Sequence, residues 1–171
     1  MWLLVLLCSC CLHQIASAIP SFAAECLREH NQIRARHGAP PLQWDSTLAR
    51  HAQQWADKLN KMDAGSIHDK RTREGENIAD GPNMSCKQGV ADWYEEYCEY
   101  YNEDYCSFPP ARHPYGGVMH FTQLVWKKTT KMGAAISGDY LVVRYSPKGN
   151  SYRHYASNVQ CASQAFNDKV C

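Results

Sequence analysis

Two histidines and two glutamates from separate segments are the side chains of this sequence best suited to chemistry. Imidazole nitrogens suit zinc, and carboxylates either ligate the ion or orient the histidines through hydrogen bonds. The same groups could act as general acid and base. The local HExxH arrangement of zinc hydrolases is absent, so spacing alone favours four unrelated surface and core residues. The four candidates for a divalent-metal site are His68, Glu76, Glu96 and His120.

The reaction class that these four residues would serve is metal-assisted hydrolysis. His68 and His120 would hold the ion, and Glu76 or Glu96 would act as base to a bound water. A serine hydrolase has less support, because the sequence contains no G-x-S-x-G elbow. We keep the metal-assisted hydrolase as an alternative to a binding protein without enzymatic activity.

A second candidate site is aromatic. Tyr100, Tyr105 and Phe108 follow the spacing φ-x-x-x-x-φ-x-x-φ, where φ is an aromatic residue, and Pro109-Pro110 comes next. Such rings could form an apolar surface for a sterol or another lipid. The simpler interpretation is that they cover the edge of the core and line a loop.

The first residues indicate export. An apolar run from Trp2 to Leu12 is followed by Ala16-Ser17-Ala18, a small-x-small cleavage pattern. We therefore expect a signal peptide at 1–18 and a secreted single domain at 19–171. The run is too short to span a bilayer as a stable anchor, and we expect no transmembrane segment. The net charge is +1 and there is no basic run, so nucleic acid is not an expected partner.

Cysteine usage agrees with export. Three of the nine cysteines lie in the expected signal peptide. The remaining even number predicts disulfides in an oxidising compartment, and the sequence does not choose among the pairings. We expect one disulfide to pin a short C-terminal tail. The six cysteines are Cys26, Cys86, Cys98, Cys106, Cys161 and Cys171.

Helical periodicity and capping residues predict three helices. The first begins near Ser21 and ends before Gly38, the second runs from Asp45 or Ser46 to Gly65, and the third spans about 88–103. His30 and Arg34 lie one turn apart on the first helix, and we expect them to make buried structural hydrogen bonds.

The rest of the chain predicts strands and loops. Segments 132–137 and 140–145 form a predicted hairpin, and 154–161 is a predicted final strand. Segment 65–83 is a predicted loop. Glu76 lies in it between Gly75 and Asn77-Ile78-Ala79, which indicates a carboxylate turned inward.

Four segments together resemble one family. They are His30-Asn31-Gln32-Ile33-Arg34, Gly75-Glu76-Asn77-Ile78, the stretch from His120 to Trp126 (HFTQLVW) and the stretch from Val143 to Asn150 (VRYSPKGN). Their order and spacing are similar to the HNxxR, GEN[LI], H[FY]TQ[LV]VW and Y-x-P-x-GN motifs of the CAP superfamily. That superfamily includes cysteine-rich secretory proteins, insect venom allergens and plant pathogenesis-related proteins. The resemblance covers about residues 22–161.

The resemblance implies an α+β fold, a three-layer α-β-α sandwich with a small antiparallel sheet. It also implies a central cleft of two histidines and two acids, which reverses the interpretation from spacing alone. His120 and Glu76 match the family motifs directly, and Glu96 matches through Trp93-Tyr94-x-Glu96. His68 matches by its place before the GEN motif. The cleft would take Zn²⁺ or Mg²⁺.

The resemblance further implies sterol or lipid binding, with the Tyr100–Phe108 loop as its candidate, or a defence- or venom-type recognition role. The sequence does not identify a protein partner. It departs from the secreted plant and venom members at Val118-Met119 and Val143-Arg144, where those members commonly carry cysteines. The disulfide pairing of those members therefore cannot be copied.

Overall fold

The computed structural model describes residues 21–63, 65–112, 114, 117–163 and 171. The predicted signal peptide at 1–18 and most of the C-terminal tail lie outside the described residues. No helix within the described ranges is long and apolar enough to cross a membrane.

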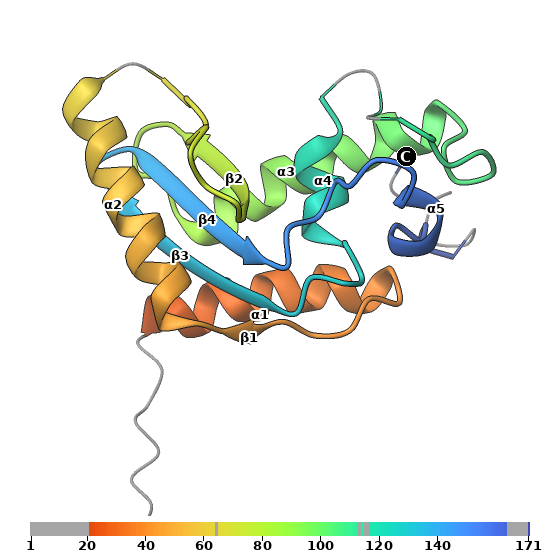
Figure 1. Ribbon diagram of the computed structural model, residues 1–171, viewed down its shortest axis with the longest axis horizontal. Coiled ribbons are helices and arrows are strands. Elements are labelled where there is room, and N and C mark those ends of the chain that lie inside the picture. Colours follow the sequence, from red (N-terminus) through yellow and green to blue (C-terminus); the bar gives the residue numbers. More distant parts are fainter. Residues whose placement is uncertain (1–20, 64, 113, 115–116, 164–170) are drawn as a thin grey trace, which may run out of the picture.

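Helices lie on both faces of a small sheet (Figure 1). Helix α2 covers one face, and α1, α3 and α4 pack on the other. This arrangement confirms the predicted three-layer α-β-α sandwich. The helices are α1 (Ser21–Arg36), α2 (Ser46–Met62), α3 (Cys86–Asn102), α4 (Met119–Leu124) and α5 (Tyr155–Asn158), and the strands are β1 (Gln43–Trp44), β2 (Gly75–Asp80), β3 (Lys131–Ser137) and β4 (Tyr140–Ser146).

The sheet has the strand order β1-β3-β4-β2. Strands β3 and β4 form the predicted antiparallel hairpin, β2 pairs antiparallel with β4, and the short β1 pairs parallel with β3. Strand β2 is therefore an edge strand. Its free edge leaves room for side chains from the loop before β2 and from α4 to meet.

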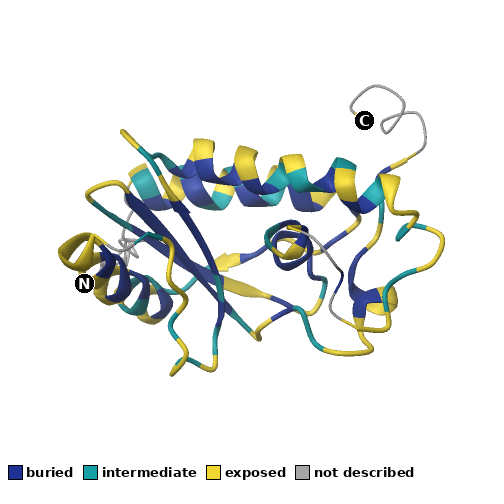
Figure 2. Ribbon diagram, turned by 90° about the horizontal axis from the view of Figure 1, so that it is seen from above, coloured by how far each residue is buried: buried dark blue, intermediate teal, exposed yellow. Residues whose placement is uncertain are grey.

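Alternation along the strands divides the core into two layers, because successive side chains point to opposite faces. In β4, Val142 packs under α2, whereas Leu141 and Val143 pack under α1, α3 and α4. Figure 2 shows buried residues, in dark blue, along the central strands and alternating with exposed residues along the long helices. Arg144 follows Val142 by two residues and therefore points to the α2 face.

Helix α2 approaches the sheet closely at Gly133. A Cβ added there would lie 2.1 Å from the backbone nitrogen of Ala49, so only glycine fits. The helix begins at Asp45, whose carboxylate accepts hydrogen bonds from the backbone N–H groups of Thr47 and Leu48. The close approach sets α2 against the part of β4 that carries Arg144, because Gly133 is paired with Arg144.

Three disulfides join the described elements: Cys26–Cys86, Cys98–Cys171 and Cys106–Cys161. The first joins α1 to α3 in the core beneath the sheet, and the second ties residue 171 to α3. These pairings settle what the sequence left open.

Two secondary-structure predictions were wrong. The segment predicted as a loop, 65–83, contains β2, because residues 75–80 pair with β4 along their whole length. The segment predicted as a final strand, 154–161, contains the short helix α5. There, the side chain of Asn158 donates to the carbonyl of His154, and the Val159 N–H donates to the Tyr155 carbonyl. These local bonds close a helical turn without any partner strand.

Candidate functional site

The fold brings the four candidate metal-site residues to the free edge of β2. His68 comes from the loop before β2, Glu76 from β2, Glu96 from α3 and His120 from α4. A cavity of about 330 Å³ opens between these elements, and Glu96 lies behind His120 outside its wall. The cavity is lined by His68, Glu76, Asn77, Gly117, Met119, His120 and Asn150.

Glu76 orients His68. Its Oε1 lies 2.7 Å from His68 Nδ1 and also accepts the backbone N–H of Asp69 at 3.0 Å. The Glu76 side chain is only 5% exposed, whereas that of His68 is 57% exposed. The prediction that the Glu76 carboxylate turns inward is therefore confirmed. The buried carboxylate holds the exposed His68 imidazole at its Nδ1 atom.

Glu96 orients His120 in the same way. Its Oε1 lies 2.6 Å from His120 Nδ1, and its Oε2 accepts the backbone N–H of Phe121 at 2.9 Å. The indole of Trp93 stacks on the imidazole with centroids 6.0 Å apart. Asn77 donates to the His120 carbonyl at 3.1 Å, which ties α4 to β2.

The two imidazoles face one another with ring centroids 6.4 Å apart. Each Nδ1 is occupied by a carboxylate, and each Nε2 has no protein partner among the described residues. Two imidazoles on one tetrahedral zinc, with Zn–N distances of about 2.0–2.1 Å, have centroids roughly 5–6 Å apart. The observed separation of the ring centroids exceeds this range, so the exposed His68 ring would have to move toward His120 for both imidazoles to hold one ion.

The carboxylates are poorly placed as direct ligands or bases. Both oxygens of Glu96 and of Glu76 already contact protein groups. Within the described ranges, no group of three or more His, Cys, Asp or Glu side chains has the geometry to hold an ion. The residues fit an open site in which two histidines ligate, the glutamates fix the ring orientations, and water or a ligand completes the coordination.

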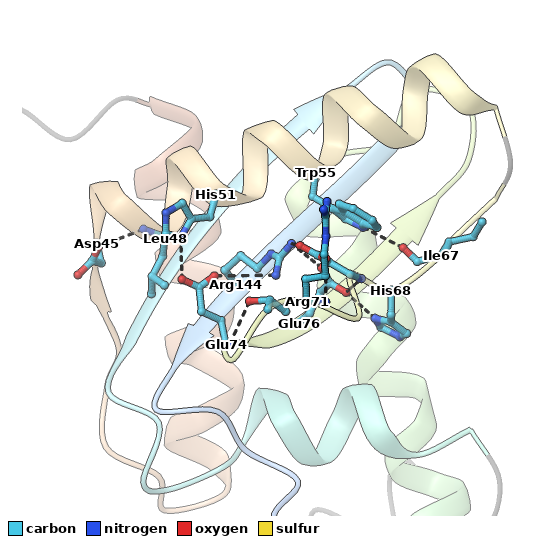
Figure 3. Close-up of polar contacts among 12 residues, drawn as sticks. Asp45, Leu48, His51, Trp55, Ile67, His68, Arg71, Glu74, Glu76 and Arg144 are labelled. Carbon is cyan, nitrogen blue, oxygen red and sulfur yellow. Dashed lines mark hydrogen bonds and ion pairs between the residues drawn. The ribbon is translucent and has the colours of Figure 1, made fainter.

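A buried guanidinium lies behind Glu76 (Figure 3). Arg144 Nη2 lies 2.9 Å from Glu76 Oε2 and 3.2 Å from Asp69 Oδ2, and Arg144 Nη1 lies 3.9 Å from Glu74 Oε2. Glu74 Oε1 in turn lies 2.7 Å from His51 Nδ1. Arg144 thus joins the His68–Glu76 pair to a second pair, His51–Glu74, on the side that faces α2.

The charges of this network shift two pKa values. The hydrogen bond that the Glu76 carboxylate accepts from the His68 ring raises the pKa of His68, because the carboxylate favours the protonated ring and outweighs the opposing effect of burial. Burial raises the pKa of Asp69, but the Arg71 N–H and the Arg144 guanidinium together outweigh burial, so that its pKa lies below the usual value.

The three aromatic residues of the predicted lipid site do not share one surface. Tyr100 is fully buried in the core, Tyr105 is half-buried against it with ring centroids 5.2 Å apart, and Phe108 is 74% exposed. Phe108 is thus the ring that the loop presents to solvent. Lipid binding itself stays a prediction.

His30 and Arg34 are structural, as predicted. His30 bonds to the Cys26 carbonyl and the Tyr145 hydroxyl, and Arg34 donates to four backbone carbonyls. Burial lowers the pKa of His30 to about 4, so its ring is neutral at pH 7. The pair fastens α1 to the segments that follow α4.

Sequence reasoning missed Arg144 and Asp69. The signal for Arg144 was present: it continues the alternation Tyr140, Val142, Arg144 on the buried face of a predicted strand, where an arginine requires carboxylate partners. Asp69 carries no comparable signal, because an aspartate in a charged loop is ordinarily solvated.

The three-layer sandwich and the two His–Glu pairs beside a cleft define a class of protein, and similarity to known sequences identifies that class. The sequence pattern of the CAP family, described as the cysteine-rich secretory protein family, matches residues 27–163. The chain belongs to this family.

Curated relatives agree with this assignment. The chain is 37% identical over 142 residues to the Golgi-associated plant pathogenesis-related protein 1 of Homo sapiens, covering 78% of this chain and 88% of that protein. It is 37% identical over 139 residues to the secreted protein RBT4 of Candida albicans, covering 75% of this chain. The match spans only 36% of RBT4, so this chain corresponds to about a third of that protein.

Solved structures show the same fold. NaASP2, in a crystal structure with Zn²⁺, matches with a TM-score of 0.59 at 19% identity, covering 88% of this chain and 93% of that one. Venom allergen-like protein 4 of Schistosoma mansoni matches with a TM-score of 0.58 at 22% identity, covering 88% and 99%.

Proposed function

We propose that this CAP protein is a secreted binding protein whose cleft holds a divalent cation between His68 and His120. The observation that carries the proposal is the pair of neighbouring imidazoles, each fixed at Nδ1 by a glutamate and, among the residues that the structure describes, without a protein partner at Nε2. Imidazole ligands favour zinc over magnesium, which prefers oxygen. The bound ion would supply a Lewis-acidic position open to a ligand, and the glutamates would hold the rings.

Export is part of this proposal. The three disulfides suit an oxidising compartment. Among the relatives, RBT4 is named a secreted protein and the human relative is named Golgi-associated. NaASP2, a protein of the same fold, has been crystallised with Zn²⁺, which agrees with the cation proposal.

A zinc titration of chelator-treated protein by calorimetry tests the cation site. We expect one equivalent to bind, and we expect His68→Gln to weaken binding at least tenfold. His51→Gln is the matched control, because His51 is also bonded to a glutamate but lies outside the cleft. Equal weakening in both variants, or unchanged binding in His68→Gln, would contradict the proposal.

The hydrolase alternative requires a free base beside the ion. Neither glutamate offers an unengaged oxygen, so a water-activating role needs one of the His–Glu pairs to open. The geometry therefore favours binding over hydrolysis.

Sterol or lipid binding is a second proposed function, and the exposed ring of Phe108 favours it. A solvent-facing aromatic beside Pro109-Pro110 can insert into an apolar ligand or surface. A sterol-binding assay on Phe108→Ser tests this, with Tyr152→Ser as control because Tyr152 is also an exposed ring, at 47%. Equal binding by wild type and Phe108→Ser would remove the loop from the lipid site.

A further inference from the structure

A second cavity, of about 400 Å³, lies on the α2 face of the sheet and plays no part in the proposed metal cleft. It opens between α2 and the loop that precedes β2, and Figure 3 shows Trp55 and Arg71 beside one another on this side of Arg144. Its polar and charged lining residues are His51, Gln54, Lys58, Asp69, Arg71, Thr72, Arg73, Glu74 and Arg144.

The acids of this cavity already have partners. Asp69 contacts Arg144 through Oδ2 and the Arg71 N–H through Oδ1, and Glu74 contacts His51 through Oε1. Arg144 is 1% exposed, and its Nε and Nη1 have no hydrogen-bond partner among the described residues. The floor of the cavity is thus a carboxylate cluster gathered around one buried guanidinium.

The rim is different, because it carries exposed cations that form no direct ion pair within the described part of the chain. Lys58, Arg71 and Arg73 are exposed, and no carboxylate among the described residues forms an ion pair with any of them. The Lys58 ammonium lies 4.5 Å from the Trp55 ring centroid, which holds it over the cavity. Two neutral side chains that can donate hydrogen bonds also line the cavity: Gln54, and Thr72, whose hydroxyl accepts the Glu74 N–H and keeps its own proton to donate.

Because the acids lie on the floor with Arg144 and the exposed cations lie on the rim, we infer that the cavity binds a phosphate or sulfate group at its rim, on Lys58, Arg71 and Arg73. Guanidinium groups match the geometry of tetrahedral oxyanions and can donate two parallel hydrogen bonds to them. The lining cations Lys58, Arg71, Arg73 and Arg144 outnumber the lining acids Asp69 and Glu74 by four to two. A bound group would sit nearer the rim cations than the carboxylates of the floor.

The cavity volume lies at the lower end of the range for small-molecule sites, roughly 300–1,000 Å³. The volume limits the ligand to a small molecule, and the rim cations select its phosphate group. The ligand class that we propose is therefore a small phosphate monoester, either free or as the headgroup of a lipid. The proposal is independent of the metal cleft, which lies on the other side of Glu76.

The test is a nuclear magnetic resonance titration of chelator-treated protein with phenyl phosphate, against chloride at matched ionic strength. We expect saturable shifts of the backbone amides of residues 70–74 and of the Trp55 indole N–H, which reports on the cavity wall. Sulfate should compete. The double variant Arg71→Gln/Arg73→Gln should weaken binding about tenfold or more, as loss of charge-assisted contacts predicts.

The control is Lys87→Gln/Lys148→Gln, which removes the same charge from exposed sites outside the cavity. Unchanged affinity in this control and weakened affinity in the arginine variant would support a specific binding site in the cavity. No saturable shift in wild type, or equal weakening in both variants, would overturn it. Phosphatidylcholine vesicles with and without phosphatidic acid then identify the source: arginine-dependent binding to the acidic vesicles assigns the lipid headgroup, and its absence assigns the free ester.

Discussion

Arg144 and Glu76 lie directly opposite one another on β4 and β2, and Nη2 of the one is 2.9 Å from Oε2 of the other. Both side chains are almost fully buried, at 2% and 5% exposure. This cross-strand pair holds the glutamate that orients His68. It therefore links the stability of the sheet edge to the geometry of the proposed metal cleft.

The first prediction concerns Arg144→Met. It removes the counter-charge of three neighbouring carboxylates, the nearly buried Glu76 and the partly exposed Asp69 and Glu74. We expect the free energy of unfolding to fall by about 3–5 kcal/mol in urea denaturation. The double variant Arg144→Met/Glu76→Gln should recover part of that loss. A single variant as stable as wild type would show that the pair contributes nothing.

The second prediction concerns Glu96→Gln. Loss of the charged partner of His120 Nδ1 should lower zinc affinity about 10–100-fold, as for other residues that orient metal ligands. Calorimetry measures the affinity, and near-ultraviolet circular dichroism verifies that the fold persists. Glu95→Gln is the control, since Glu95 is exposed on the same helix. Retained affinity in Glu96→Gln would argue against an orienting role.

The third prediction compares two buried tyrosine hydroxyls. Within the described ranges the Tyr100 hydroxyl has no hydrogen-bond partner, whereas that of Tyr145 bonds to His30 and Asn77. An unsatisfied buried hydroxyl costs about 1–3 kcal/mol, so Tyr100→Phe should raise the free energy of unfolding. Tyr145→Phe should lower it by a similar amount. Thermal or urea unfolding of both variants checks the contrast, and losses of equal size would refute it.

The fourth prediction concerns acid. Burial lowers the pKa of both His30 and His37 to about 4. The unfolded chain therefore binds protons more readily than the folded one below pH 6.5. Stability is fully present above that pH and falls as the pH drops toward 4, with each histidine contributing about 2 kcal/mol of the loss at pH 5.

Urea unfolding at pH 7 and pH 5 measures this loss. His37→Gln should reduce the pH dependence, since glutamine does not titrate. A variant that keeps the full dependence of wild type would show that His37 is not a source of it.

The three layers, and the four residues that form the two His–Glu pairs, were predicted through the resemblance to the CAP family, because spacing alone did not favour a common site. Periodicity marked the three long helices, and motif order marked Glu76 and His120. Strand β2 was missed because Gly75–Asp80 has no local strand pattern and becomes a strand only by pairing with β4. The partners of Glu76 were missed for the same reason: Arg144 lies 68 residues further along the chain and is brought to Glu76 by the register of the sheet.

The most direct test of the account is anomalous X-ray scattering at the zinc edge from crystals of the protein soaked with zinc. We expect one peak between His68 and His120, about 2.0–2.1 Å from both Nε2 atoms, with Glu76 and Glu96 still bonded to the Nδ1 atoms. A soaked crystal without a peak there, or with zinc bound through the glutamate oxygens, would contradict it.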